Sequence, residues 1–151
     1  MKQRPIGKSI SRIVAVQILY KLEFNPTLNV DEILEETALE IKEDKKEFAK
    51  EHKLEGYPDK NYMIKIVKGA SSQKAELEEI IKPFLAENIE YEKLNHIIRF
   101  ILMLATYELK ELKTPFKVVI NEYMGVSARF CNDNELGLVN GVLDAIANKI
   151  V

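Results

Sequence analysis

Residues 94–112, LNHIIRFILMLATYELKEL, constrain the fold most, because they gather more apolar residues than a one-sided surface helix can hold. The unbroken apolar run from Phe100 to Ala105 excludes the alternation of a half-buried strand. Polar residues recur here at spacings of 4, 7, 4 and 3, which predicts one narrow polar stripe along a helix. They are Asn95, Arg99, Thr106, Lys110 and Lys113. The run is too short and too interrupted to cross a bilayer. We therefore predict a central buried helix against which other helices pack.

The composition is that of one globular helical domain. The chain has 151 residues, of which 46% are hydrophobic and 30% are charged. It is therefore long enough to bury a core, and its composition is not typical of disorder. Six glycines, five prolines and little strand-like alternation favour an all-α fold.

The two ends of the chain carry expected helix boundaries. Residues 1–8 are expected to form a flexible arm, after which Ser9 or Ser11 can cap a first helix. The polar break at residues 132–134 is expected to precede the last helix.

The middle of the chain holds further boundaries. Residues 31–55 contain ten acids, and residues 42–53 have so few apolar side chains that they are either a solvated helix or a partly mobile excursion. Pro83 should interrupt a later helix. Thr114 is the expected cap of the helix after the central one, with Pro115 at its first position.

The charges are unevenly distributed. The net charge of −2 gives no nucleic-acid signal, but the first 25 residues hold five basic residues and one acid. They are Lys2, Arg4, Lys8, Arg12, Lys21 and Glu23. This asymmetry predicts a local basic patch on an acidic body. No apolar signal segment follows the start, and the single Cys131 excludes an internal disulfide, so a cytoplasmic protein is expected.

The basic segment supports an RNA-binding hypothesis. Lys8 and Arg12 are four residues apart and therefore share one face of the first helix, with Arg4 on the arm before it. Tyr20 lies two turns beyond Arg12. Cations for phosphates, an aromatic ring for stacking and an arm that orders on contact are typical of single-stranded RNA sites. The alternatives are a solubilising surface for the cations and a half-buried core position for Tyr20.

No motif indicates catalysis, a metal or a cofactor. His52 and His96 are the only histidines, and no Cys or His cluster has metal-ligand spacing. Neither a GxxxxGK[ST] loop nor a GxGxxG turn is present. We therefore expect a protein that is not an enzyme and needs no cofactor.

Four segments, in order along the chain, carry a family likeness. They are AVQILY at 15–20, ATYEL at 105–109, TPFKVVINEY at 114–123 and LVNGVLDAIA at 138–147. Together they resemble the NusB transcription antitermination factors. The resemblance implies an all-α, NusB-like bundle of about seven helices in two small subdomains that divide near residue 88. It also implies that Gly141 permits a close helix approach.

The resemblance implies a non-catalytic RNA-binding adaptor. In the family, NusB pairs with a small-subunit ribosomal protein, NusE, and the pair binds the boxA element of nascent ribosomal RNA. The pair then joins the RNA polymerase antitermination complex. On this resemblance the RNA-binding residues are Arg4, Lys8, Ser9, Arg12, Tyr20 and Asn134, the last in a loop.

Two other functions remain open at this point. The first is a helical protein–protein module or homodimeric scaffold, formed through the central helix or the apolar seam of residues 136–150, so that either a monomer or a homodimer is expected. The second follows from NusB-like domains at the front of ribosomal RNA methyltransferases. The absence of a Gly-rich cofactor region counts against the second.

Overall fold

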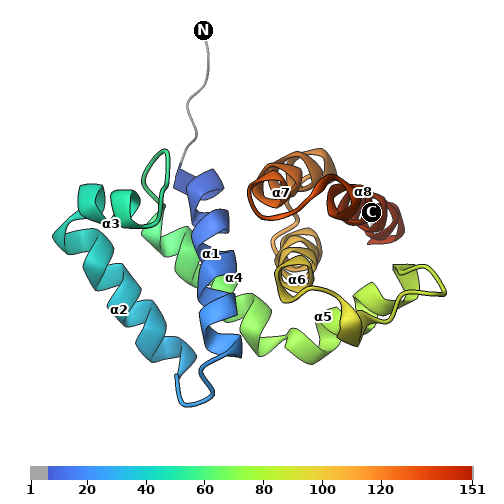
Figure 1. Ribbon diagram of the computed structural model, residues 1–151, viewed down its shortest axis with the longest axis horizontal. Coiled ribbons are helices and arrows are strands. Elements are labelled where there is room, and N and C mark those ends of the chain that lie inside the picture. The colour runs from blue at the N-terminus through green and yellow to red at the C-terminus, as the bar shows by residue number, and fades with distance from the viewer. Residues whose placement is uncertain (1–6, 151) are drawn as a thin grey trace, which may run out of the picture. The chain divides into compact units, whose positions relative to one another are not determined.

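The computed structural model describes residues 7–150, and all regular secondary structure in this part of the chain is helical (Figure 1). Its elements are α1 (Gly7–Glu23), α2 (Val30–Glu43), α3 (Lys45–Glu51), α4 (Lys60–Ser72), α5 (Lys74–Ile81), the 3-10 turns η1 (Lys82–Phe84) and η2 (Tyr91–Lys93), α6 (His96–Lys110), α7 (Phe116–Phe130) and α8 (Asp133–Ile150). The all-α prediction is confirmed. The described residues hold one α-helix more than the expected seven, because Asp44 ends α2 and caps α3.

The chain divides into two compact units, residues 1–68 and 69–151. The first unit comprises α1 to α3 and most of α4, and the second comprises the elements from α5 onward. The division falls inside α4, beside Gly69. The subdomain boundary near residue 88 stays a prediction.

The acidic segment of the first unit is helical. Asn29 caps α2, because its Oδ1 accepts hydrogen bonds from the backbone nitrogens of Asp31 and Glu32 at 2.8 and 3.3 Å. In the short helix α3, Phe48 and Ala49 are 2% and 7% exposed. These two buried side chains hold α3 in place, so residues 45–51 form the helix that one of the two interpretations predicted.

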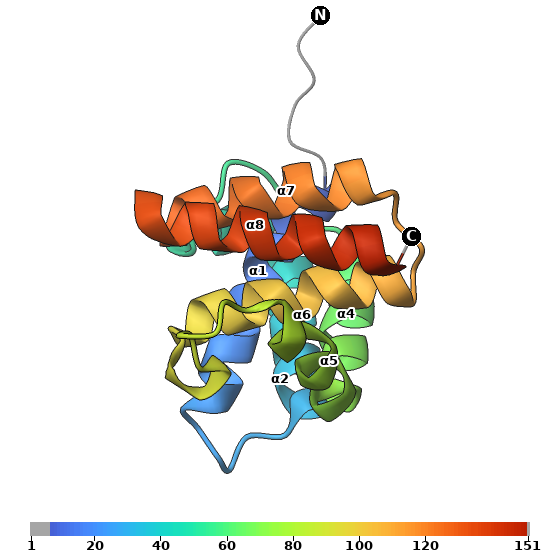
Figure 2. The ribbon, with the colours of Figure 1, turned by 90° about the vertical axis from the view of Figure 1, so that its right-hand side faces the viewer.

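The helix α6 is the buried centre of the second unit, as the sequence predicts. Every residue from Phe100 to Leu109 is buried, and Asn95 caps the helix by accepting a 2.7 Å hydrogen bond from the backbone nitrogen of Ile97. The helices α5, α7 and α8 pack against α6, and Figure 2 shows α7 and α8 running beside it. The predicted α8 seam is buried here through Val139 and Leu143, among others.

One carboxyl group, that of Glu108, is fully buried inside the second unit. The Tyr123 hydroxyl donates to its Oε2 at 2.5 Å, and the Thr114 hydroxyl donates to its Oε1 at 3.2 Å. The backbone nitrogen of Thr114 also donates to the carbonyl oxygen of Glu108 at 3.1 Å. Thr114 therefore binds Glu108 and does not cap α7, so that prediction is wrong by one position. Pro115 occupies the cap, and the helix begins at Phe116.

Two residues singled out by the sequence, Pro83 and Gly141, have different outcomes, and Gly69 has a packing constraint of its own. Pro83 interrupts its helix as predicted, since α5 ends before it and η1 contains it. Gly69 lies against the Tyr107 ring so closely that a Cβ at this position would overlap the ring and force it to move. The close helix approach expected at Gly141 is wrong, because this residue is exposed and a Cβ there would meet no atom within 4 Å.

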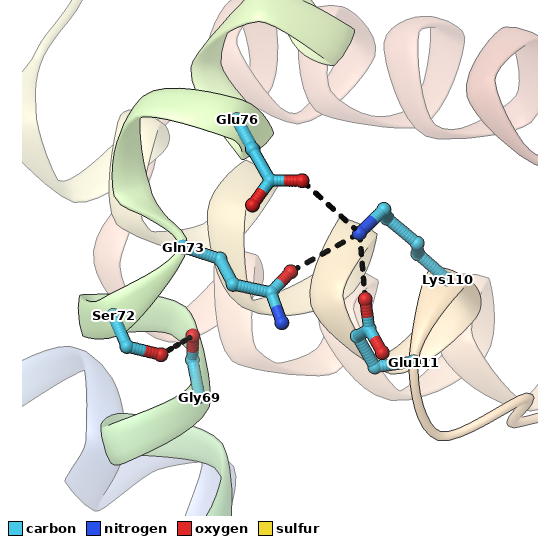
Figure 3. A network of polar contacts seen from close by, with 6 residues as sticks. All are labelled: Gly69, Ser72, Gln73, Glu76, Lys110 and Glu111. Carbon is cyan, nitrogen blue, oxygen red and sulfur yellow. Dashed lines mark hydrogen bonds and ion pairs between the residues drawn. The ribbon is translucent and has the colours of Figure 1, made fainter.

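A polar network joins the end of α6 to the start of α5 (Figure 3). Lys110 Nζ donates to Glu111 Oε2 at 2.6 Å and to Gln73 Oε1 at 3.2 Å, and it lies 3.6 Å from Glu76 Oε2. The hydrogen bond to Glu111 raises the pKa of Lys110, and the same bond lowers the pKa of Glu111. The charge of Lys110 is therefore satisfied within the second unit.

Candidate nucleic-acid interface

The first turn of α1 is fastened to the residue that precedes α4. The backbone nitrogen of Asp59 lies 3.1 Å from the Gly7 carbonyl oxygen and 2.8 Å from Ser11 Oγ, and donates to both. The buried Ser11 hydroxyl lies 2.7 Å from the carbonyl oxygens of Gly7 and Asp59. A Cβ at Gly7 would lie 2.9 Å from Asp59 Cβ, which is too close.

These contacts correct the predicted start of the first helix. The helix begins at Gly7, inside the expected arm, and neither Ser9 nor Ser11 caps it. The physical reason is that the Ser11 hydroxyl bonds to the carbonyl oxygens of Asp59 and Gly7. The bond to Asp59, next to α4, stabilises residues 7–11 as the first turn of the helix.

Lys8 and Arg12 lie beside the same aromatic ring, that of Tyr62 in α4. Lys8 Nζ is 5.0 Å and Arg12 Cζ is 5.4 Å from the ring centroid, both within cation–π range. Arg12 Nη2 also donates to the Tyr62 hydroxyl at 3.4 Å. We call these three residues the Tyr62 cluster. The two cations share one side of α1, as their spacing predicts.

The two cations of the Tyr62 cluster differ in exposure. Lys8 is exposed, whereas Arg12 is only 4% exposed. Across residues 7–150, no carboxylate forms an ion pair with Lys8. Lys8 is therefore the member of the cluster that can meet an anion arriving from solvent, and Arg12 is a buried neighbour of the ring.

Tyr20 lies near the other end of α1 and is 45% exposed, so about half of its side-chain surface is covered and the residue is not part of the core. Its ring contacts that of Phe24, which is 52% exposed, with centroids 4.8 Å apart and planes at 48°. Twelve residues separate Tyr20 from Lys8, which is about 18 Å along a helix. Phe24 is absent from the predicted set, because it lies two residues before Pro26, where the sequence indicates only that the first helix ends.

The remaining predicted residues lie elsewhere. Asn134 is exposed in the first turn of α8, in the second unit, and not in a loop. The helix starts early because Asn132 and Glu135 exchange hydrogen bonds of 2.9 Å in both directions, which is a capping box. Ser9 is partly exposed on α1, and Arg4 lies outside the described residues.

Tyr62 is the member of the cluster that sequence reasoning missed. Its spacing to Ile66 and Ala70 indicates the apolar face of a helix, and both of those residues are fully buried. Tyr62 itself is only partly buried, because it lies in the first turn of α4. The sequence contained one signal for this position. Asp59 is a typical N-cap residue, and a helix that begins after it has Tyr62, three positions later, in its first turn.

The sequence model of the NusB family matches residues 9–148. The chain belongs to the NusB family. Transcription antitermination protein NusB of Rhodospirillum rubrum is 30% identical to it over 158 residues, covering 97% of this chain and 85% of that protein. The NusB of Campylobacter jejuni strain RM1221 is 32% identical over 133 residues, covering 87% and 88% of the two chains.

Two solved structures resemble this NusB-family chain. NusB of T. maritima matches with a TM-score of 0.75 and 26% identity, over 99% of this chain and 94% of that one. A crystal structure of the antitermination factors NusB and NusE in complex with dsRNA matches with a TM-score of 0.71 and 22% identity, over 93% and 96%. At that identity the second likeness shows the fold alone.

As a NusB-family member, the chain is a non-catalytic protein. Burial raises the pKa of the Cys131 thiol, and Glu135 adds to this effect, so the thiolate that a nucleophile needs is disfavoured. Within residues 7–150, no three His, Cys, Asp or Glu side chains are grouped to hold a metal ion. None of the described helices combines the length and apolarity needed to cross a membrane.

Proposed function

We propose that this chain is a transcription antitermination factor that acts as an RNA-binding adaptor. With the ribosomal protein NusE it binds boxA-type single-stranded RNA in nascent ribosomal RNA transcripts, and it joins the RNA polymerase antitermination complex in the cytoplasm. Family membership supports the antitermination role, because the relatives are transcription antitermination proteins. The solved complex of NusB and NusE with dsRNA, whose fold this chain shares, supports both partners.

The observation that carries the RNA-binding part is the state of Lys8. Its ammonium group is exposed, is held 5.0 Å from the centroid of the Tyr62 ring and has no carboxylate partner among residues 7–150. An exposed, unneutralised lysine on a short basic segment is what attracts a phosphate backbone, while the body of the protein is acidic.

The other proposed RNA residues have unequal roles. The exposed pair of Tyr20 and Phe24 offers two ring faces on which bases can stack. Ser9 and Asn134 are polar and accessible enough to donate to phosphates or base edges. Arg12 contributes positive charge from a buried position, and Arg4 belongs to the proposal through the sequence alone.

The adaptor mechanism is linked binding. One exposed lysine and one aromatic pair give a weak, salt-dependent grip on RNA. A second protein that contacts both this chain and the RNA makes the two contacts parts of one complex, so the effective local concentration raises the affinity without any new contact on this chain. Specific binding is therefore expected only with the ribosomal partner.

The test is a titration of boxA-like single-stranded RNA at several salt concentrations. Lys8→Ala removes one phosphate contact, so the affinity should fall and the slope of log K against log salt should become shallower by about 0.7. Lys42→Ala on α2, an exposed lysine on an element with no proposed RNA residue, is the matched control and should leave the slope unchanged. Equal slopes for wild type and Lys8→Ala would remove Lys8 from the site.

Two further arms of the titration test the partner and the RNA. Adding the ribosomal protein should tighten binding of the single strand, and a duplex of the same sequence should compete less well. No tightening by the ribosomal protein would reject the adaptor mechanism.

A homodimeric scaffold is the weaker candidate. The surfaces that the sequence offered for it are largely buried inside the second unit: the central helix, and Val139, Leu143 and Ile146 of the α8 seam. Light scattering measures the oligomeric state directly, and a monomer that binds RNA would exclude the scaffold.

A further inference from the structure

We propose that Tyr62 is a positioning residue for RNA binding: its ring holds the Lys8 side chain extended and charged at the surface, ready for a phosphate. This inference rests on the proposed RNA-binding function and adds a residue that the basic sequence pattern does not indicate. Tyr62 touches the cations and acts on RNA through Lys8.

The ring itself is fixed by two links to its surroundings. The backbone nitrogen of Tyr62 donates to Asp59 Oδ1 at 3.0 Å, which caps α4 and sets the first turn of that helix. The backbone of Asp59 is bonded in turn to Gly7 and Ser11 of α1. Hydrogen bonds therefore join α4, which carries the ring, to α1, which carries the cations, and one of these bonds is made by Gly7, next to Lys8.

Arg12 strengthens the hold on the ring from the helical turn after Lys8. It is almost fully buried, its guanidinium lies 5.4 Å from the ring centroid, and its Nη2 donates to the ring hydroxyl at 3.4 Å. The hydroxyl bond and the ring contact restrict the orientation of Tyr62. Although it is buried, Arg12 can therefore support the Tyr62 ring.

An aromatic holder differs from a carboxylate holder in its effect on charge. A carboxylate that fixed Lys8 would also neutralise it, and a phosphate would have to displace that carboxylate. A ring attracts the ammonium through its quadrupole and carries no net charge, so the ammonium keeps its charge and donors for a ligand. Holding the long lysine side chain in advance also reduces the rotamer entropy that RNA binding would otherwise cost.

The test uses the full chain with Tyr62→Leu and Tyr62→Phe, alone and combined with Lys8→Ala. Tyr62→Leu should weaken binding of single-stranded boxA-like RNA by about two- to fivefold, the strength of a cation–π contact at an exposed site. Tyr62→Phe keeps the ring and should restore most of the affinity. In the Lys8→Ala background, Tyr62→Leu should have little further effect, because its partner is already gone.

Each departure from that pattern has a separate meaning. If Lys8→Ala leaves RNA affinity unchanged, the proposed RNA function of this surface fails. If Lys8→Ala weakens binding and Tyr62→Leu does not, only the positioning role is overturned. A full additional loss from Tyr62→Leu in the Lys8→Ala background would also overturn it, because Tyr62 would then be contacting RNA independently.

An NMR measurement on the wild-type chain gives a readout that needs no variant, and Tyr62→Phe can be added as a control. A ring close to Lys8 Nζ should shift the Lys8 Hε protons upfield, and Tyr62→Phe should retain that shift. Lys8 Hε resonances at the values of a free lysine would overturn the proposal whatever the binding data show.

Discussion

Two tyrosines of this chain each lie beside two cations, and the surroundings of the cations differ. The first is the Tyr62 cluster of the first unit. The second, in the second unit, is the Tyr91 cluster: Tyr91 in η2, with Lys82 Nζ 5.9 Å and Arg99 Cζ 5.5 Å from its ring centroid. Distance to the ring therefore does not separate a binding surface from a structural contact.

The lysines of the two clusters differ in their carboxylate partners. Lys82 Nζ lies 3.2 Å from Glu79 Oε2 and 3.3 Å from Glu92 Oε2, and these hydrogen bonds raise the pKa of Lys82. Tyr91 is 3% exposed, and burial raises the pKa of its hydroxyl. In the Tyr91 cluster the ring is buried and Lys82 is paired with two carboxylates, whereas in the Tyr62 cluster Lys8 is exposed and pairs with no carboxylate among residues 7–150. We therefore expect the Tyr91 cluster to serve folding, and we propose that Lys8 of the Tyr62 cluster serves binding.

The largest expected effect concerns stability. Tyr91→Ala removes a buried ring and should lower the free energy of unfolding by roughly 3 kcal/mol. Tyr62→Ala removes a partly buried ring and should cost less, roughly 1–2 kcal/mol by the smaller apolar area lost. Urea unfolding monitored by circular dichroism measures both. Equal losses would show that Tyr62 is as structural as Tyr91 and would break the contrast.

The central helix shows why much of the fold is predictable from sequence. Buried helices leave a periodic pattern, so α6, the α8 seam and the interruption at Pro83 follow from spacing and backbone chemistry alone. The errors fall at helix starts. The Thr114 hydroxyl donates to the Glu108 carboxylate, and the Ser11 hydroxyl donates to the carbonyl oxygen of Asp59, which is 48 residues away along the chain. A cap predicted from local sequence is wrong when the capping side chain forms its hydrogen bond with a residue outside the helix that it was expected to cap.

The candidate site was less predictable for the same reason. The placement of Lys8 and Arg12 on one side of α1 follows from helical spacing, but the ring beside them comes from α4. Spacing also does not show that Arg12 is buried whereas Lys8 is exposed. The family motifs add a related point. Glu108 of ATYEL and Tyr123 of INEY bond to each other inside the second unit, so those motif residues have a structural role.

Charge reversal should separate the two clusters in RNA binding. Lys8→Glu replaces an attractive charge with a repulsive one at the proposed phosphate contact, and should weaken binding of boxA-like RNA by roughly tenfold at low salt. Lys82→Glu changes the net charge by the same amount within a set of carboxylates, and its effect on affinity should be much smaller. Filter binding at matched salt gives both values. A comparable loss for Lys82→Glu would mean that total charge, and not the location of Lys8, controls affinity.

The smallest expected effect is the pH dependence of stability from the Tyr91 cluster. Because the folded-state pKa of Lys82 is raised, its contribution is present below pH 10.5 and is lost as the pH rises through the folded value. The pKa of Glu92 is lowered, first by a hydrogen bond from its own backbone and then by Lys82, so its contribution is present above pH 4.5 and is lost as the pH falls through the folded value.

Lys82→Met should therefore lower the melting temperature slightly between about pH 5 and 10, and the difference from wild type should fade on both sides of this window and at high salt. Lys8→Met is the matched control, since Lys8 has no carboxylate partner among residues 7–150 and its melting difference should not follow that window. Thermal melts of the three proteins across pH measure the contrast. If Lys8→Met reproduced the profile of Lys82→Met, Lys8 would be engaged with a carboxylate in solution, and its charge would not be available to RNA.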